Sequence, residues 1–391
     1  MIDAPAARTL PAALALALAA AVSLGLARFS YALLLPPMRQ DLAWNYVTAG
    51  GMNTLNAVGY LIGALLMPRL MRRLDARWLM LAGGAGAALL LALHATTRAD
   101  ALLALLRTAT GVCSAASFVG GGLLAARLAS RVPARSGLVL GIYYGGVGMG
   151  IIGSALLVPP LVDAAPQRWP AAWLVLALAA ALFTVLTALG TRSLRAPPAA
   201  GAPRTHAALG GLALGLAGYT MFGLGYIAYM TFIITLLREQ GLPSASVIGF
   251  YVLLGVGVVA SSWLWAGLLQ RHRNGRPMAI LNALLALATV LPVLSARPLV
   301  VFVSGALFGG VFLSVVASTT ALVRHNLPPA DWPAGIAAFT IVFAAGQIVG
   351  PTVVGWIADG SGGLARGFVA SAAVLALGAL LAALQRALPR T

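Results

Sequence analysis

Residues 11–37 read PAALALALAAAVSLGLARFSYALLLPP, an apolar run whose single charged side chain is Arg28. An α-helix needs roughly 20 consecutive apolar residues to cross about 30 Å of hydrocarbon. The run also exceeds the apolar core of a secretory signal peptide, which holds roughly 7–15 residues. It therefore predicts a membrane-spanning helix that stays in the protein.

Further apolar runs of similar length follow along the whole chain. They cover approximately residues 46–68, 78–96, 101–126, 137–160, 169–191, 207–237, 245–269, 277–296, 298–323, 333–358 and 364–386. Each run is continuous rather than alternating, which favours helices over a transmembrane barrel. Only 8% of the 391 residues are charged, against roughly 25% in soluble domains. The sequence predicts an all-α membrane protein with twelve transmembrane helices and excludes an ordinary soluble enzyme.

The net charge of +17 comes from 25 basic residues, all of them arginine, and 8 acidic ones. The arginines are dispersed between apolar runs without a basic stripe, which argues against a nucleic-acid partner. With the N-terminus in the cytoplasm, 17 arginines fall on the cytoplasmic side, 6 on the other, and Arg28 and Arg107 within helices. This bias predicts that both termini are cytoplasmic. Tryptophans at the ends of runs are expected to anchor the helices at the interface: Trp44, Trp78, Trp169, Trp173 and Trp332.

The longest polar connection, from Thr191 to His206, contains three prolines and three arginines. It predicts a six-helix bundle at 1–191, a cytoplasmic linker at 192–206 and a second six-helix bundle at 207–391. The two halves also resemble each other at an offset of 198 residues, through the pairs Gly25/Gly223, Tyr31/Tyr229, Gly59/Gly257 and Gly111/Gly309. Two pseudo-symmetric halves are typical of transporters with a binding site near the membrane midplane.

Other chemistry has little support in the sequence. One cysteine, Cys113, excludes an internal disulfide, and the four histidines have no ligand-like spacing. We expect no metal site and no cofactor. Paired acids, a His-Cys pair and a phosphate-binding loop are not found, which argues against a membrane-embedded enzyme.

Three segments carry a family resemblance. They are Leu24–Tyr31 (LGLARFSY), Leu35–Met38 (LPPM) and Gly50–Tyr60 (GGMNTLNAVGY). On these segments and its twelve-helix pattern, the chain resembles the major facilitator superfamily, and within it a poorly characterised bacterial branch often labelled YbfB-like. The resemblance implies the major facilitator fold and a secondary transporter that works by alternating access. It also implies a monomer in the bilayer of a bacterial inner membrane, with a small-molecule substrate and a proton or a counter-anion as a possible second ion.

The family motifs match unevenly. Arg107 and Gly111 fit the family's R-x-x-x-G pattern, whereas the glycine-rich run 137–160 lacks the usual Gly-Pro pair, which occurs instead at Gly350-Pro351. In the loop at 68–77, Arg72 stands where the family has an aspartate and Asp75 stands at a later glycine. The resemblance implies coupling or gating roles for Arg107, Asp75, Arg73 and Asp359.

Arg28 is the sharpest functional candidate. A charge within the bilayer costs at least ~2.5 kcal/mol on insertion scales and usually faces the bundle interior. All eight acids fall at or beyond predicted helix ends, which argues against a cation exporter. A guanidinium accepts a carboxylate through two parallel hydrogen bonds. We therefore predict a small organic anion as substrate. A structural, snorkelling arginine and an efflux transporter for drugs or for neutral or cationic metabolites remain the alternatives.

Further polar side chains lie on helices that line the cavity in the family. We predict substrate contacts from Tyr31, Asn53, Asn56, Tyr60, Tyr143, Tyr144, Tyr226, Tyr229 and Gln347. The alternative is that these side chains only join helices by hydrogen bonds, which contribute about 0.6 kcal/mol each on average in membranes.

Overall fold

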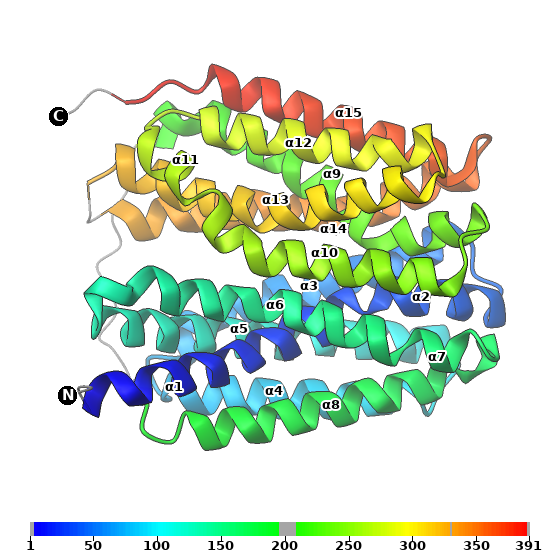
Figure 1. The fold of residues 1–391 in the computed structure, drawn as a ribbon, viewed down its shortest axis with the longest axis horizontal. Helices are drawn as coiled ribbons and strands as arrows, with labels where there is room; N and C mark the ends of the chain where they lie inside the picture. Colours follow the sequence, from blue (N-terminus) through cyan, green and yellow to red (C-terminus); the bar gives the residue numbers. More distant parts are fainter. Residues whose placement is uncertain (1–3, 195–208, 329–330, 389–391) are drawn as a thin grey trace. The chain divides into compact units, whose positions relative to one another are not determined.

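The computed structural model describes residues 4–194, 209–328 and 331–388, and these residues form helices and connecting turns without any strand (Figure 1). The described residues divide into two compact units. Unit 1 lies within Met1–Trp44 and Leu55–Gly201, and unit 2 within Asn45–Thr54 and Ala202–Thr391.

Unit 1 begins with a first membrane helix made of three segments: α1 (Ala4–Ala20), a π-helix η1 (Ala21–Phe29) and α2 (Tyr31–Asp41). The later helices of this unit are α4 (Ala76–His94), α5 (Asp100–Ser130), α6 (Ser136–Leu157), α7 (Pro159–Val162) and α8 (Trp169–Gly190). Two 3₁₀ turns, η2 (Pro133–Arg135) and η3 (Pro166–Arg168), precede α6 and α8. Helix α3 (Tyr46–Leu70) belongs to unit 2 as far as Thr54 and to unit 1 from Leu55 onward.

Unit 2 continues with the turn η4 (Leu209–Leu212) and seven helices. These are α9 (Ala213–Glu239), α10 (Ser244–Leu264), α11 (Ala266–Arg271), α12 (Arg276–Leu294), α13 (Pro298–Asn326), α14 (Trp332–Asp359) and α15 (Gly363–Leu384). Within this unit, α9 packs against α14 and α15, and α12 packs against α13 and α15.

The predicted all-helical membrane fold is confirmed, because a helix covers each of the twelve predicted runs. Eleven helices in the described part of the chain are long and apolar enough to span a membrane. The predicted run that is not among them is α3, which has 25 residues. Asn53, Thr54 and Asn56 lie in its middle, and their polar side chains lower its hydropathy.

The internal repeat is visible as a repeated close approach of backbones. A Cβ on Gly59 would overlap the carbonyl oxygen of Thr108, and a Cβ on Gly257 would press on that of Ala306. Likewise, Gly111 lies against the Asn56 carbonyl and Gly309 against the Leu254 carbonyl. In all four correspondences the residue numbers differ by the offset of 198 read from the sequence. The same glycine contacts therefore join α3 to α5 and α10 to α13.

The two most buried spans are the first membrane helix and α9, which the repeat relates to each other. Of their most apolar windows, 78% and 83% of the residues are buried. Each is the core of its own unit, since α1 and η1 contact α5, α6 and α8 while α9 contacts α13, α14 and α15. The predicted boundaries at 191 and 207 stay a prediction, because most of the predicted linker, with Arg195 and Arg204, lies outside the described residues.

Candidate functional site

Arg28 lies in the π-helix of unit 1. All nine residues of η1 are buried, and the Ser30 N–H donates to the Gly25 carbonyl at 3.0 Å, the i→i−5 bond of a π-turn. Gly25 and Gly150 of α6 are in backbone contact, so η1 is pressed against a neighbouring helix where no side chain intervenes. π-segments are rare and occur frequently at functional sites.

The Arg28 guanidinium is 4% exposed and lies between aromatic rings. Its Cζ is 5.5 Å from the centroid of the Tyr60 ring on α3 and 5.9 Å from that of Phe29. Cation–π contacts at this range stabilise a cation more strongly when water is excluded. The structure therefore brings together two predicted site residues, Arg28 and Tyr60.

A second cation, Arg107 of α5, reaches the same helix. It is 1% exposed, its Cζ lies 4.5 Å from the centroid of the Tyr31 ring, and its Nη1 donates to the Ala27 carbonyl at 3.3 Å. The charges of Arg28 and Arg107 act on each other. A spacing of three would put Tyr31 and Arg28 on one face of a regular α-helix, and the structure places the Tyr31 ring against Arg107. Two guanidiniums thus approach the stretch Ala27–Tyr31, which is suited to binding an anion.

Asn56 links α3 to this cluster. Its Nδ2 donates to the backbone carbonyl of Arg107 at 3.0 Å, and its buried Oδ1 has no hydrogen-bond partner among the described residues. Gly111, the glycine of the R-x-x-x-G motif, provides the space for the approach of Asn56, because a Cβ there would overlap the Asn56 carbonyl. The motif therefore combines a buried cation with a close helix contact.

Two tyrosines of α6 take different places. The fully buried Tyr143 donates through its hydroxyl to the Phe118 carbonyl of α5 at 2.5 Å. Tyr144 is exposed, and its ring lies 5.2 Å from that of Tyr143. Tyr143 therefore joins α5 to α6, whereas the Tyr144 hydroxyl makes no hydrogen bond to another described residue.

The remaining predicted substrate contacts lie in unit 2. Asn53 donates to the Thr231 hydroxyl of α9 at 2.7 Å, and the Tyr229 hydroxyl is 2.6 Å from Ser304 Oγ of α13. The Tyr229 ring stacks on Phe308 at 3.9 Å, and the Tyr226 ring stacks on Phe222 at 4.7 Å. Gln347 is buried in α14. The contacts of Asn53 and Tyr229 join α3 to α9 and α9 to α13, whereas the Tyr226 and Phe222 rings stack within α9.

Three of the predicted gating residues, Asp75, Arg73 and Asp359, lie at or near helix ends. Asp75 accepts a hydrogen bond from the N–H of Arg77 at 2.8 Å and so caps α4, while Arg73 is exposed in the preceding turn. Within unit 2, Asp359 at the end of α14 accepts from the N–H groups of Tyr46 and Val47 at 2.8 and 2.9 Å. A carboxylate at the start of a helix is favourable, since it faces the positive end of the helix dipole. Gating roles for these residues remain proposals.

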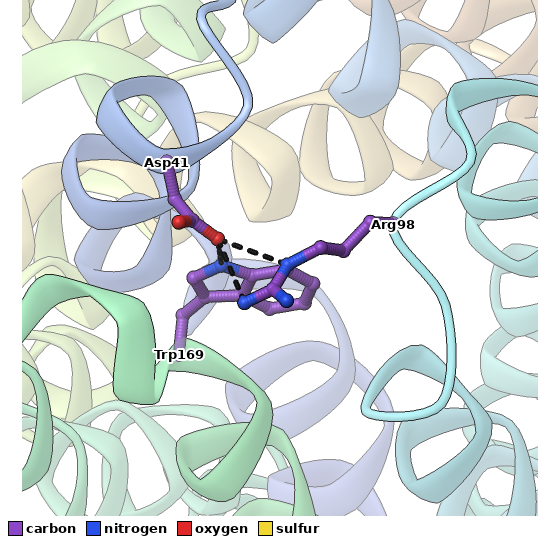
Figure 2. A network of polar contacts seen from close by, with 3 residues as sticks. All are labelled: Asp41, Arg98 and Trp169. Carbon is purple, nitrogen blue, oxygen red and sulfur yellow. Dashed lines mark hydrogen bonds and ion pairs between the residues drawn. The ribbon is translucent and has the colours of Figure 1, made fainter.

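A polar cluster at the end of α2, the start of α8 and the loop that leads into α5 was not predicted. Asp41 Oδ2 accepts from the Trp169 indole at 2.7 Å and from Arg98 Nε at 3.2 Å, with Arg98 Nη2 at 3.1 Å (Figure 2). The Trp44 indole donates to Asp100 at 2.8 Å. The expectation of interfacial tryptophans is wrong for Trp44 and Trp169, which are buried inside unit 1. Their indole N–H groups donate to Asp41 and Asp100, which lie at helix ends within the same unit.

A second missed pair is His94 and Trp173. Both side chains are fully buried, their rings stack with centroids 4.6 Å apart, and Arg107 Cζ lies 6.0 Å from the Trp173 ring. Trp173 is therefore not an interfacial anchor either. Within the described residues no group of three or more His, Cys, Asp or Glu side chains is arranged to hold a metal ion.

Comparisons with known proteins agree with this architecture. The family model described as "Uncharacterised MFS-type transporter YbfB" matches residues 20–383. Among solved structures, a mutant of the nucleoside transporter NupG superposes with a TM-score of 0.75 at 15% identity, over 94% of this chain and 98% of that one. A bacterial homologue of the human lysosomal transporter Spinster, inward-facing and unoccupied, superposes with a TM-score of 0.73 at 13% identity, over 98% and 99%. No curated protein matches the sequence. At these identities the solved structures support the fold alone.

Proposed function

The chain belongs to the family described as uncharacterised MFS-type transporter YbfB, and we propose that it moves a small organic anion, a carboxylate, across the membrane by alternating access. Membership in the major facilitator superfamily (MFS) makes it a multi-pass membrane transporter of small molecules rather than an enzyme. The observation that carries the anionic substrate is the position of Arg28, buried in the π-segment of the first membrane helix.

The cation cluster supports an anion for two reasons. Arg28 and Arg107 both lie within 6 Å of aromatic rings in the interior of unit 1, where a low dielectric strengthens their attraction for an anion. The acidic side chains in the described part of the chain lie at helix termini or in turns: Asp41, Asp75, Asp100, Asp163, Glu239, Asp331 and Asp359. A buried carboxylate is what a cationic substrate would require.

The repeat supports placing the anion in unit 1. At the offset of 198 residues, Arg28 corresponds to Tyr226 and Arg107 to Gly305. Unit 2 therefore has one tyrosine and one glycine where unit 1 has two cations. Because the shared fold does not require cations at these positions, their presence in one half points to a chemical role.

The membrane and orientation follow from the same proposal. We place the protein in a bacterial inner membrane as a monomer, as the family resemblance implies. We place both termini in the cytoplasm on the strength of the 17-to-6 bias of arginines between the two sides. Arg8, Arg195, Arg204 and Arg390 contribute to that count, but their side chains lie outside the described part of the chain.

Counterflow in proteoliposomes tests the substrate class. The panel holds lactate, succinate and benzoate as anions, uridine as a neutral metabolite and tetraphenylphosphonium as a cation. We expect Arg28→Ala to lower counterflow of the accepted anion about tenfold or more, as for loss of a hydrogen bond to a charged group. Arg69→Ala removes an exposed arginine from the end of α3 and should leave transport unchanged.

Two results would overturn the proposal. Equal anion transport by Arg28→Ala and the parent would show that Arg28 does not hold the substrate. Transport of uridine or tetraphenylphosphonium that persists in Arg28→Ala, with no anion transported, would support the alternative of an efflux transporter for neutral or cationic compounds.

A further inference from the structure

The stacked pair of His94 and Trp173 leaves two buried ring nitrogens without hydrogen-bond partners among the described residues. These atoms are His94 Nε2 and Trp173 Nε1. His94 is the last residue of α4, and Trp173 lies one turn into α8. A buried polar atom without a partner costs about 1–3 kcal/mol. Two such costs in one stacked pair of rings call for an explanation.

The protonation state of the His94 ring follows from its other nitrogen. Nδ1 is 2.7 Å from the carbonyl oxygen of Leu90, and a carbonyl can only accept a hydrogen bond. Nδ1 therefore carries the proton. In the neutral ring Nε2 is then a bare acceptor, so the atom without a partner is the one able to take up a further proton.

Arg107 lies close to the stacked pair, since its Cζ is 6.0 Å from the centroid of the Trp173 ring that stacks on His94. Of the helices packed against α4, the near half of α5 contributes Asp100, Arg107 and Cys113, η1 contributes Arg28, and the adjoining α2 contributes Tyr31. Asp100 accepts from the Trp44 indole. The described side chains of α1 and α8 include no titratable group. A proton on His94 would thus add a positive charge to a region that already holds two guanidiniums.

An anion bound near Arg28 and Arg107 would make a proton on His94 more favourable. Like charges disfavour one another at short range in a low dielectric, and a negative charge between them compensates the repulsion. Binding of an anion near Arg107 or Arg28 therefore favours protonation of Nε2, and protonation favours binding of the anion. The reciprocity is a thermodynamic necessity for two ligands on one protein.

We propose that His94 is the proton-binding residue of this transporter, and that a proton and an organic anion cross the membrane together. The inference rests on the proposed function, because it requires an anionic substrate. Nε2 forms an N–H bond with a proton from water on the side where the anion enters. On the other side the anion leaves, the N–H bond breaks, and the proton returns to water. One proton moves with each anion, and no other reactant is needed.

The pH dependence of anion binding tests the coupling. The probe is whichever of lactate, succinate or benzoate shows Arg28-dependent counterflow with the full chain in proteoliposomes. We expect its apparent affinity to rise about tenfold for each unit that the pH falls below neutrality, with one proton taken up per anion. In His94→Gln the affinity should lose this dependence, and an inward anion gradient should no longer acidify the lumen.

His272 provides a matched control. Its Nδ1 lies 3.1 Å from the carbonyl of Leu268, four residues earlier, as Nδ1 of His94 does with Leu90. It follows directly after α11 in unit 2, whereas Arg107 belongs to unit 1. His272→Gln should keep the parent's pH dependence and lumen acidification. If His94→Gln keeps them too, or if the parent shows Arg28-dependent transport without proton movement, the proposal is overturned.

Nitrogen NMR of the parent in micelles, with His94→Gln to assign the signal, tests the residue without any transport measurement. We expect a neutral Nδ1–H ring at pH 7 without an organic anion and an imidazolium after the accepted anion is added. An imidazolium at pH 7 without the anion would overturn the inference whatever the panel shows. If no anion in the panel gives Arg28-dependent counterflow, the proposed function itself fails, which is a different result from Arg28-dependent counterflow without proton movement.

Discussion

The guanidinium Cζ of Arg107 lies 4.5 Å from the centroid of the Tyr31 ring, while Nη1 of the same side chain donates to the Ala27 carbonyl. Ala27 and Tyr31 are on either side of Arg28 and of the junction where the π-helix ends. Arg107 therefore fixes the segment that carries the proposed substrate anchor, and it brings a second positive charge to it.

Replacement of Arg107 separates its charge from its packing. Arg107→Gln should weaken binding of the transported anion about tenfold, since a hydrogen bond to a charged group contributes about 1.5–3 kcal/mol. Arg107→Lys keeps the positive charge but not the planar guanidinium, so its affinity for the anion should fall less than that of Arg107→Gln. Calorimetric titration of both purified variants measures the affinities. Parent-like affinity in Arg107→Gln would leave Arg107 a packing role only.

The ring of Tyr60 should matter more than its hydroxyl. Because the Arg28 cation lies 5.5 Å from the ring centroid, Tyr60→Phe keeps the contact whereas Tyr60→Leu removes it. A desolvated cation–π contact contributes about 0.5–2 kcal/mol, so we expect several-fold weaker anion counterflow in Tyr60→Leu and little change in Tyr60→Phe. Equal losses in both variants would instead indicate that the hydroxyl contacts the substrate.

The continuous apolar runs predicted the helices because burial in lipid depends on composition, which one sequence displays directly. The glycines that revealed the repeat in the sequence also mark a contact in the structure, since Gly59 and Gly111 leave room for a close backbone approach between α3 and α5. Side-chain partners were harder to predict. A spacing of three puts Tyr31 and Arg28 on one face of an α-helix, but the π-segment changes the rotation per residue and Tyr31 meets Arg107 instead.

Contacts between distant segments explain most of what the sequence did not reveal. His94 and Trp173 both read as residues at helix ends, and nothing in their own segments shows that the rings stack. The sequence also did not reveal that α3 belongs to unit 2 as far as Thr54. Its first residues contact Thr231 and Asp359, which lie far along the chain.

Two glycines of α3 should respond oppositely to alanine. A Cβ at Gly59 would overlap the backbone carbonyl of Thr108, whereas a Cβ at Gly51 has no described atom within 4 Å. Gly59→Ala should lower the free energy of unfolding by about 1–3 kcal/mol through overpacking. Gly51→Ala should be neutral or raise it by up to ~1 kcal/mol through helix propensity. Thermal unfolding in detergent compares them, and a Gly59→Ala as stable as Gly51→Ala would contradict the α3–α5 contact.

The cluster in Figure 2 should depend more on Asp41 than on Arg98. Asp41→Ala removes the hydrogen-bond acceptor of the fully buried Trp169 indole. We expect it to lower the free energy of unfolding by about 1–3 kcal/mol. The Arg98 side chain is 60% exposed, so Arg98→Gln should cost at most about 1 kcal/mol. High salt should diminish the Arg98 effect and leave the Trp169 effect. The melting temperatures of both variants at low and high salt provide the measurement, and equal, salt-sensitive losses would be inconsistent with the Trp169 bond.

Tyr229 and Ser304 form a buried pair whose direction the structure defines. Ser304 Oγ donates its one hydrogen to the Ala288 carbonyl at 2.7 Å, so the Tyr229 hydroxyl, 2.6 Å away, must be the donor to Ser304. Ser304→Ala then leaves the buried Tyr229 hydroxyl without an acceptor. We expect it to lower the free energy of unfolding by about 1–3 kcal/mol. Tyr229→Phe leaves the Ser304 donor satisfied and should cost less.

The double variant distinguishes this geometry from simple loss of packing. Once Tyr229→Phe has removed the hydroxyl, Ser304→Ala no longer strands a donor, so the double variant should be more stable than the sum of the single losses allows, by about 0.5–1.5 kcal/mol. Unfolding in mixed detergent micelles, with all four proteins measured together, gives the coupling energy. Strict additivity would mean that the two hydroxyls do not interact. A transport defect in Tyr229→Phe without any loss of stability would instead return Tyr229 to the substrate contacts that the sequence predicted.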